Sequence, residues 1–276
     1  MAEELSILEA VVLGVVQGLT EWLPVSSSGH LVLVQHYLDV EVTLFFDVLL
    51  HVATLGVIVL FYRETIRDVL VALARVPRDR RDGASWRAIW WDTPPRRLAV
   101  LVVVGSAATA SLALPAEELL RDAFASTLVV GIALIATGTW LFAARFAPPV
   151  DPDRPGLWDG LLIGLAQGTA FVPGVSRSGA TIGMALLRGV EREHAVRFSF
   201  LLSVPAIVGA TVYEANTAAV GSTSAWPTYL VGMAVAALVG YAALWLLVRI
   251  VERRGFTHFC WYCWALGAAT VALALS

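Results

Sequence analysis

Long hydrophobic runs separated by short polar segments dominate the pattern of this chain. A helix that crosses a membrane needs about 20 mostly apolar residues. Six stretches fit this requirement: 44–62, 98–114, 124–147, 195–213, 226–248 and 259–275. We therefore predict an all-α polytopic membrane protein with six transmembrane helices.

Two further apolar regions, 5–38 and 157–188, are interrupted by polar residues and fit single crossings badly. In each region a long apolar run is followed by a polar tip and then by a short apolar run. The first tip has the sequence SSSGH and the second SRSG. Irregular backbone survives at membrane depth only where protein or a water-filled cavity covers it. Each region therefore predicts a re-entrant helix pair that turns back at its polar tip.

The two tips are also related in sequence. At an offset of 150, Gln17-Gly18 falls on Gln167-Gly168, Val25-Ser26 on Val175-Ser176, and Ser28-Gly29 on Ser178-Gly179. This predicts one membrane domain, 1–276, built from two copies of a unit, 1–147 and 156–276. Each unit has one re-entrant pair and three crossings, so an odd number of crossings inverts the second copy. Inverted repeats of this kind place their sites near the middle of the membrane.

The arginines give an independent prediction of topology. Of the 19 basic residues, 17 lie in the segments 63–97, 145–156, 188–197 and 249–254, which share one side in this arrangement. Only Arg121 lies on the other side, where the acidic residues Glu3, Glu4, Glu9, Glu117, Glu118 and Glu214 gather. By the positive-inside rule the arginine-rich side is cytoplasmic and both termini are outside. The overall charge of −3 gives no reason to expect a nucleic-acid partner.

The composition is typical of a membrane protein, with 58% hydrophobic and only 15% charged residues. Polar and charged side chains at membrane depth are costly, so they are candidates for function. An arginine fork such as Arg177 can grip two phosphate oxygens, and the helix starts after both tips offer N–H groups to an anion. Glu21 among such groups fits a divalent cation that bridges it to phosphate, and a histidine beside a serine can transfer a proton. The tips thus predict a phosphoryl-transfer site, with these candidates: Gln17, Glu21, Ser26, Ser27, Ser28, His30, Ser176, Arg177, Ser178 and Thr181.

Structural roles compete with this interpretation. Serine and glycine also occur where membrane helices pack closely, His30 could lie at the membrane interface, and Glu21 and Arg177 could form a purely structural ion pair. Asp47 and His51, one helical turn apart, are interpreted as supports for the first re-entrant pair. The tryptophans, Trp22 and Trp140 among them, are interpreted as interfacial anchors.

Two segments carry a resemblance to a known family. QGLTEWLPVSSSGH at 17–30 and PGVSRSGAT at 173–181 resemble the two signatures of the undecaprenyl-diphosphate phosphatase family, whose members confer bacitracin resistance. FFDVLLHVATL at 45–55 and RFSFLLSVPA at 197–206 agree as well. The resemblance covers nearly the whole chain, and it implies hydrolysis of a C55 polyprenyl diphosphate to the monophosphate at the outer face of the cytoplasmic membrane.

The resemblance also implies roles for single residues. Glu21 and Gln17 would belong to a site for a divalent metal, Mg²⁺ or Ca²⁺, although many members have glutamate where this chain has Gln17. Ser27 would be the nucleophile and His30 its proton partner. The phosphate would be held by the second tip and its neighbours: Arg177, Ser176, Ser178, Ser26, Gly174 and Thr181.

Several alternatives stay open from the sequence. The attacking group is either Ser27 or a metal-held water, and only the serine route predicts a phosphoenzyme. A polyprenyl-phosphate transporter or flippase that uses the same site is the rival function, because inverted repeats with broken helices are common in transporters. The length of the lipid tail and a homodimeric state are not fixed by the sequence.

Overall fold

The computed structural model describes residues 5–40, 42–113, 115, 123–151, 155–217 and 225–276. Throughout these residues the regular structure is helical, which confirms the all-α prediction. Five residues of the topology argument lie outside the described residues: Glu3, Glu4, Glu117, Glu118 and Arg121. One arginine of the arginine-rich segments, Arg154, also lies outside them.

Five described helices are long and apolar enough to cross a membrane. They are α7 (Pro94–Ala113), α9 (Thr127–Ala143, continued by η2, Ala144–Phe146), α12 (Arg192–Thr217), α13 (Trp226–Glu252) and α14 (Phe259–Leu275, preceded by η4, Phe256–His258). The sixth predicted crossing is α3 (Leu44–Phe61), which bends by 73° into the helices that follow it. The count is therefore five, or six if that bent pair is taken as one crossing.

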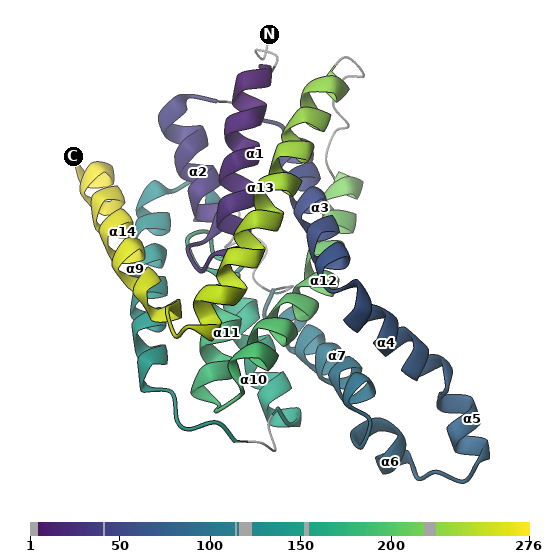
Figure 1. The fold of residues 1–276 in the computed structure, drawn as a ribbon. Helices are drawn as coiled ribbons and strands as arrows, with labels where there is room; N and C mark the ends of the chain where they lie inside the picture. Colours follow the sequence, from purple (N-terminus) through teal and green to yellow (C-terminus); the bar gives the residue numbers. More distant parts are fainter. Residues whose placement is uncertain (1–4, 41, 114, 116–122, 152–154, 218–224) are drawn as a thin grey trace.

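The two regions predicted to be re-entrant each form a helical hairpin. The first consists of α1 (Ile7–Trp22) and α2 (Ser27–Leu38), and the second of α10 (Leu157–Thr169) and α11 (Arg177–Leu187). All four helices are shorter than the roughly 20 residues that a crossing needs. The hairpins enter from opposite ends of the molecule, and their turns meet near its middle (Figure 1).

The hairpins pack against the long helices in matching ways. Helix α1 lies along α13, and α10 lies along α7. Both pairs approach so closely that only glycine fits: a Cβ on Gly14 would lie 2.5 Å from the Gly232 oxygen, and one on Gly164 would lie 2.3 Å from the Gly105 oxygen. Small residues at such crossings let membrane helices pack backbone to backbone, which here fixes each hairpin to its partner helix.

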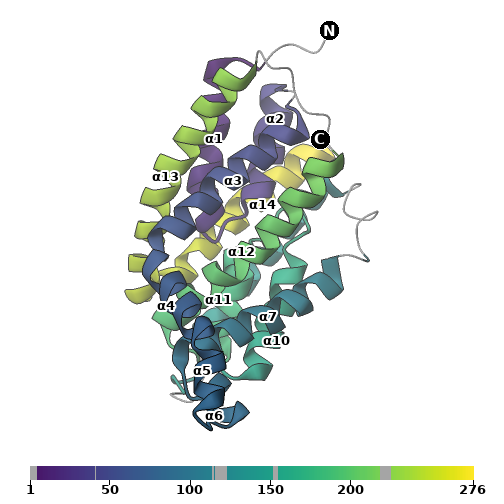
Figure 2. The same ribbon diagram turned by 90° about the vertical axis from the view of Figure 1, so that its right-hand side faces the viewer.

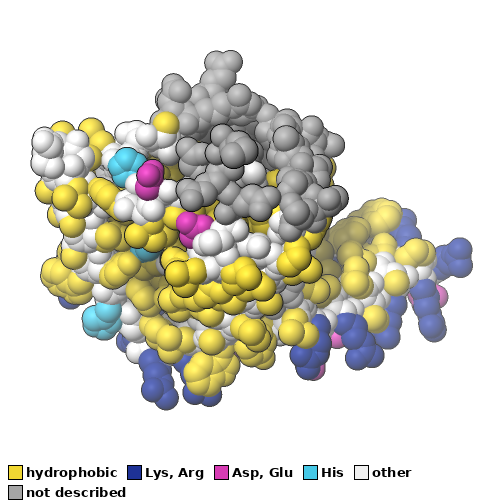
Figure 3. All heavy atoms as spheres, turned by 90° about the horizontal axis from the view of Figure 1, so that it is seen from above, with side chains coloured by type: hydrophobic (Ala, Val, Ile, Leu, Met, Phe, Trp, Pro, Cys, Tyr) yellow, Lys and Arg dark blue, Asp and Glu magenta, His cyan; other side chains and the backbone are white. Residues whose placement is uncertain are grey.

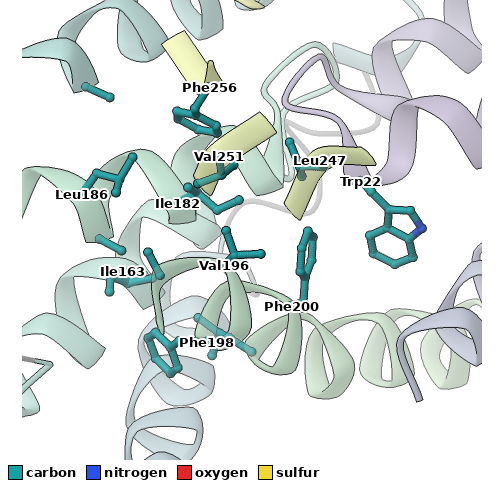
Figure 4. Packing of buried hydrophobic residues seen from close by; sticks show 14 of the residues in the cluster. Trp22, Ile163, Ile182, Leu186, Val196, Phe198, Phe200, Leu247, Val251 and Phe256 are labelled. Carbon is teal, nitrogen blue, oxygen red and sulfur yellow. The ribbon is translucent and has the colours of Figure 1, made fainter. Parts of the chain in front are cut away.

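The main hydrophobic core lies between the hairpins and helices α12 and α13 (Figure 4). Trp22 is fully buried in this core and meets Phe200 edge to face, with ring centroids 5.5 Å apart. The interpretation of Trp22 as an interfacial anchor is therefore wrong. Its position directly before the first turn places the indole under the polar tip, where it packs instead of facing lipid.

An arginine-rich arm projects from one end of the molecule (Figure 1). It is built from α4 (Arg63–Ala74), α5 (Val76–Arg81) and α6 (Trp86–Trp91). Both termini lie at the other end (Figure 1), and from that end basic side chains are seen mainly along the arm and at the margin (Figure 3). The molecule thus has one arginine-rich end and one end that carries the termini.

Candidate active site

The turn of the first hairpin is fixed by Ser26. Its hydroxyl oxygen caps α2 by accepting a hydrogen bond from the Gly29 amide at 3.3 Å. Ser26 holds a φ of +71°, which is unusual for a residue with a side chain. This backbone conformation starts α2 with Ser27 as its first residue, so the Ser27 hydroxyl lies at the positive end of the helix dipole.

The turn of the second hairpin repeats this arrangement. Ser176 caps α11 by accepting a hydrogen bond from the Gly179 amide at 3.1 Å, and Arg177 is the first residue of the helix. Thr137 of α9 stabilises the turn, because its hydroxyl donates to the Gly174 carbonyl oxygen at 2.9 Å. Arg177 therefore occupies in α11 the position that Ser27 occupies in α2.

Glu21 joins the two tips. Its Oε2 accepts a hydrogen bond from the Ser27 hydroxyl at 2.6 Å and one from the Gln17 amide at 3.1 Å. Its Oε1 accepts from Arg177 Nη2 at 2.5 Å. Glu21 is 6% exposed, so these contacts form away from bulk water, where charge-assisted hydrogen bonds are strong. One carboxylate therefore holds the predicted nucleophile and the predicted phosphate clamp together.

Arg177 retains unused hydrogen-bonding capacity. Its Nη1 has no hydrogen-bond partner among the described residues, while its guanidinium lies over the Trp22 ring at 5.4 Å from the centroid. A guanidinium that is held by Glu21 on one side and by an aromatic ring below keeps its donors fixed in space. It can therefore offer N–H groups to an anion with little reordering.

A pocket of about 790 Å³, which includes the space at its mouth, lies over these groups. Both tips contribute polar side chains, and the second half of α12, which runs toward the end with the termini (Figure 2), contributes apolar ones. The lining residues are Thr20, Glu21, Ser26, Ser27, Ser28, His51, Gln167, Ala170, Phe171, Val175, Ser176, Arg177, Ala206, Ile207, Ala210 and Thr211. Polar groups converge here at one side of an apolar chamber, as suits a phosphorylated lipid.

His30 lies away from this pocket. Its Nδ1 is 2.7 Å from the Ser26 carbonyl oxygen, and its Nε2 is 2.7 Å from the Tyr262 hydroxyl of α14. Both ring nitrogens are thereby engaged, and no hydrogen bond joins His30 to Ser27. The structure does not bring this predicted pair together, and a direct proton transfer between them would require rearrangement.

The remaining predicted residues divide into two groups. Ser28 and Ser176 line the pocket, whereas Gly174, Ser178 and Thr181 do not. The Ser178 hydroxyl donates to the Leu23 carbonyl oxygen at 3.2 Å, and the Thr181 hydroxyl is 2.5 Å from that of Ser199. Ser178 therefore ties the second hairpin to the first, and Thr181 ties it to α12, behind the site.

His51 lies closer to the proposed chemistry than its interpretation as a support suggests. It lines the pocket, and its Nε2 is 3.7 Å from Glu21 Oε2. Asp47 does contact the first hairpin, because its carboxylate accepts from the Gln35 amide of α2 at 3.1 and 3.2 Å. The sequence does offer a hint of this role, because His51 is a polar residue in an otherwise apolar helix and lies one turn after Asp47.

A divalent cation fits these residues only with the help of substrate. Among the described residues no group of three or more His, Cys, Asp or Glu side chains could hold a metal. The available donors are the Glu21 carboxylate and Gln17 Oε1, which is buried without a hydrogen-bond partner among the described residues. Mg²⁺ is commonly held by one or two carboxylates together with substrate phosphates. This donor set is compatible with that arrangement and too small for a preformed protein cage.

Comparison with known proteins identifies relatives along almost the whole chain. Residues 10–269 match the family model described as bacitracin resistance protein BacA. The chain is 38% identical to an undecaprenyl-diphosphatase of Desulforapulum autotrophicum, over 97% of this chain and 98% of that protein. It is 40% identical to one of Desulfosudis oleivorans, with the same coverage, and 36% identical to one of Korarchaeum cryptofilum, over 98% and 100% of the two chains.

Proposed function

Because the chain belongs to the BacA bacitracin resistance family, we propose that it is an undecaprenyl-diphosphatase that acts through Ser27, Glu21 and Arg177. The substrate is a polyprenyl diphosphate, and the products are the monophosphate and inorganic phosphate. The single observation that carries this assignment is Glu21, which binds Ser27 and Arg177 at once although they come from opposite hairpins.

The Ser27 hydroxyl attacks the terminal phosphorus of the substrate and gives its proton to Glu21, its hydrogen-bond partner at 2.6 Å. An O–P bond forms at Ser27, and the bond from phosphorus to the bridging oxygen breaks. The bridging oxygen keeps the electron pair and leaves as polyprenyl monophosphate. Water then hydrolyses the phosphoserine and restores the Ser27 hydroxyl. In the alternative route, water attacks phosphorus directly and Ser27 only positions it.

Arg177 and the helix starts stabilise the charge of the transferring phosphate. Arg177 donates to its oxygens, and the first residues of α2 and α11 line the same chamber, so the positive ends of both helices lie near the anion. Glu21 and Gln17 would hold a divalent cation together with the diphosphate, and that cation would neutralise negative charge on the substrate. Ser27 and Arg177 lie at matching helix starts. This supports a scheme in which one tip supplies the nucleophile and the related tip binds the phosphate.

We propose that the two hairpins are re-entrant, that the two halves form an inverted repeat, and that the pocket opens to the outer face of the membrane. The hairpins enter from opposite ends, and their glycine contacts with α13 and α7 match. The predicted cytoplasmic side is the arginine-rich end, and the pocket lies along the half of α12 that runs toward the termini (Figure 2). A recycled lipid carrier would then be dephosphorylated outside the cell.

Phosphate release from a C55 polyprenyl diphosphate by detergent-purified protein tests the proposal. Release should require Mg²⁺ or Ca²⁺ and should fall by about 1,000-fold or more in Ser27→Ala and Arg177→Ala. Ser111→Ala is the matched control, because Ser111 lies outside the pocket and its hydroxyl donates to the Ala108 carbonyl oxygen of its own helix. A folded wild type that releases no phosphate, with several tail lengths and either metal, would instead favour a lipid transporter. Lipid flipping in proteoliposomes would measure that activity.

A trapping experiment separates the two nucleophiles. With substrate labelled in the terminal phosphate, rapid acid quenching of the wild type should retain label on Ser27, identified by peptide mass spectrometry. A wild type that turns over rapidly without any labelled serine would exclude the serine route.

A further inference from the structure

A second pocket, of about 730 Å³ including the space at its mouth, lies at the arginine-rich end of the molecule, far from Ser27 in the fold. It is formed by α4, the first residues of α7, and the start of α12. Its lining includes Asp68, Pro94, Arg97, Leu98, His194 and Arg197. Its floor includes Leu101 and Phe198, which are 1% and 2% exposed and belong to the main hydrophobic core.

The ends of three helices meet at this pocket, and lipid headgroups would lie at its level where the candidate spans cross a membrane. The candidate spans Pro94–Ala113 and Arg192–Val212 both begin at it. Helix α4 reaches it directly after the 73° bend at the end of α3. Apolar segments of these helices extend from the pocket into the membrane, while the arginine-rich arm extends away from it (Figure 1). Polar and charged groups at such a boundary meet lipid phosphates.

The pocket carries an uncommitted positive charge. The Arg97 guanidinium takes part in no hydrogen bond or ion pair within the described part of the chain. Arg197 is paired with Glu193 of its own helix, and His194 Nδ1 lies 3.1 Å from Glu191 Oε2. Asp68 is the one acidic side chain among the described residues of the lining. A half-buried arginine without a partner, beside a second arginine and above apolar walls, matches an amphiphile with a single negative charge.

We propose that this pocket binds the headgroup of an anionic phospholipid, with its phosphate held by Arg97 and Arg197. The glycerol and the start of the acyl chains lie against Leu98 and the proline residues at the helix starts. Arginine suits this task because its fork can bind two phosphate oxygens at once. The surrounding arm adds attraction to an anionic membrane surface. The site is independent of the chemistry at Ser27 and takes part in no step of it.

The test is a titration of purified protein in a neutral detergent with phosphatidylglycerol, read by native mass spectrometry, beside the same titration with phosphatidylcholine. The wild type should bind phosphatidylglycerol more tightly. Arg97→Gln and Arg197→Gln should each weaken that binding by about tenfold. Arg87→Gln, which removes an exposed arginine of the arm, is the matched control and should stay within about twofold of wild type. Equal unfolding temperatures without lipid show that the variants are folded.

Leu98→Trp provides a second variant that keeps both arginines and fills the apolar part of the pocket. It should also weaken phosphatidylglycerol binding, whereas inorganic phosphate at millimolar concentration should not displace the lipid from the wild type. Three outcomes would overturn the proposal. They are equal affinity for the two lipids, a loss in Arg87→Gln as large as that in Arg97→Gln, and displacement by phosphate alone, which would make the site one for free phosphate.

Discussion

The hydroxyl oxygen of Ser26 accepts a hydrogen bond from the Gly174 amide at 3.1 Å, across 148 residues of sequence. This bond ties the two hairpin turns directly to each other, beside the Glu21 contacts. Gly174 can make it because its φ is +96°, a conformation that a residue with a Cβ rarely adopts. A Cβ at this position would also lie 2.5 Å from the Val130 oxygen. The junction of the tips therefore depends on glycine at position 174.

Gly174→Ala should destabilise the fold by about 2 kcal/mol or more, because alanine meets both the backbone strain and the clash with Val130. Thermal unfolding in detergent measures this change. Gly56→Ala is the matched control: no atom lies within 4 Å of a Cβ built there, so its unfolding temperature should stay equal or rise slightly. An unfolding temperature for Gly174→Ala as high as that of the control would contradict the importance of this junction.

Arg177→Lys should lower kcat by about 100-fold and leave the unfolding temperature close to wild type. A lysine keeps the charge beside Glu21, but it has no second fixed donor for a phosphate oxygen. Steady-state kinetics with polyprenyl diphosphate and thermal unfolding should be measured on the same preparations.

Arg188→Lys is the matched control for that change. Arg188 donates to the Asp159 carboxylate at 2.8 Å and lies outside the pocket, so its activity should remain within about threefold of wild type. If Arg177→Lys loses folded protein and activity in equal measure, the Glu21–Arg177 pair is structural rather than a phosphate clamp.

Much of the fold follows from the hydrophobic pattern, because a membrane imposes helix on every apolar stretch of sufficient length. The two serine caps could also be predicted, since Ser26 and Ser176 share one local sequence and therefore one local hydrogen bond. Local rules of this kind predict equivalent helix starts for Ser27 and Arg177 without reference to any tertiary contact.

The rest depended on contacts that no local pattern encodes. Tyr262 binds His30 from 232 residues away, and nothing in the sequence around His30 specifies that partner. Tryptophan is a residue type common at membrane interfaces, which is why the sequence suggests an anchor at Trp22. Its burial follows instead from the position of α12 beneath the turn. Arg96 lies among eight other arginines in 63–97, and only the tertiary structure shows that it is 3% exposed.

Arg96 joins all three helices of the arm, and its loss should loosen them. Its guanidinium donates to the Ala72 carbonyl oxygen at 2.7 Å, to the Ile89 carbonyl oxygen at 3.3 Å, and to the Asp79 carboxylate. Arg96→Gln leaves these acceptors without a charged donor, so trypsin should cut within 63–97 about tenfold faster than in wild type. Phosphate release should change little, because the arm is remote from the pocket.

Arg87→Gln is the matched control. It also removes one trypsin site, but the Arg87 side chain is exposed and makes no hydrogen bond or ion pair within the described residues. Its cleavage rate should equal that of wild type. Equal cleavage of the two variants would show that the arm is held by packing against α7 and not by Arg96.

His30 separates a positioning role from a proton-transfer role. The Ser26 carbonyl oxygen can only accept, so His30 Nδ1 is the donor in that bond and the Tyr262 hydroxyl donates to Nε2 when the ring is neutral. In His30→Asn the side-chain amide can donate to Ser26 in place of Nδ1. We therefore expect kcat within about tenfold of wild type in His30→Asn, and a loss of about 100-fold in His30→Ala, which removes the side-chain hydrogen bond to the Ser26 carbonyl oxygen.

Tyr262→Phe completes the comparison. It removes only the hydrogen bond at His30 Nε2 and should lower kcat by about threefold. A histidine that transfers the proton of Ser27 would give another pattern. His30→Asn would then be as inactive as His30→Ala, since an amide does not titrate near neutral pH, and both would lose the factor of about 10² to 10⁴ that general acid–base catalysis contributes. Because Glu21 already accepts the Ser27 hydrogen bond, the structure favours the first pattern: His30 holds the Ser26 turn from which Ser27 projects.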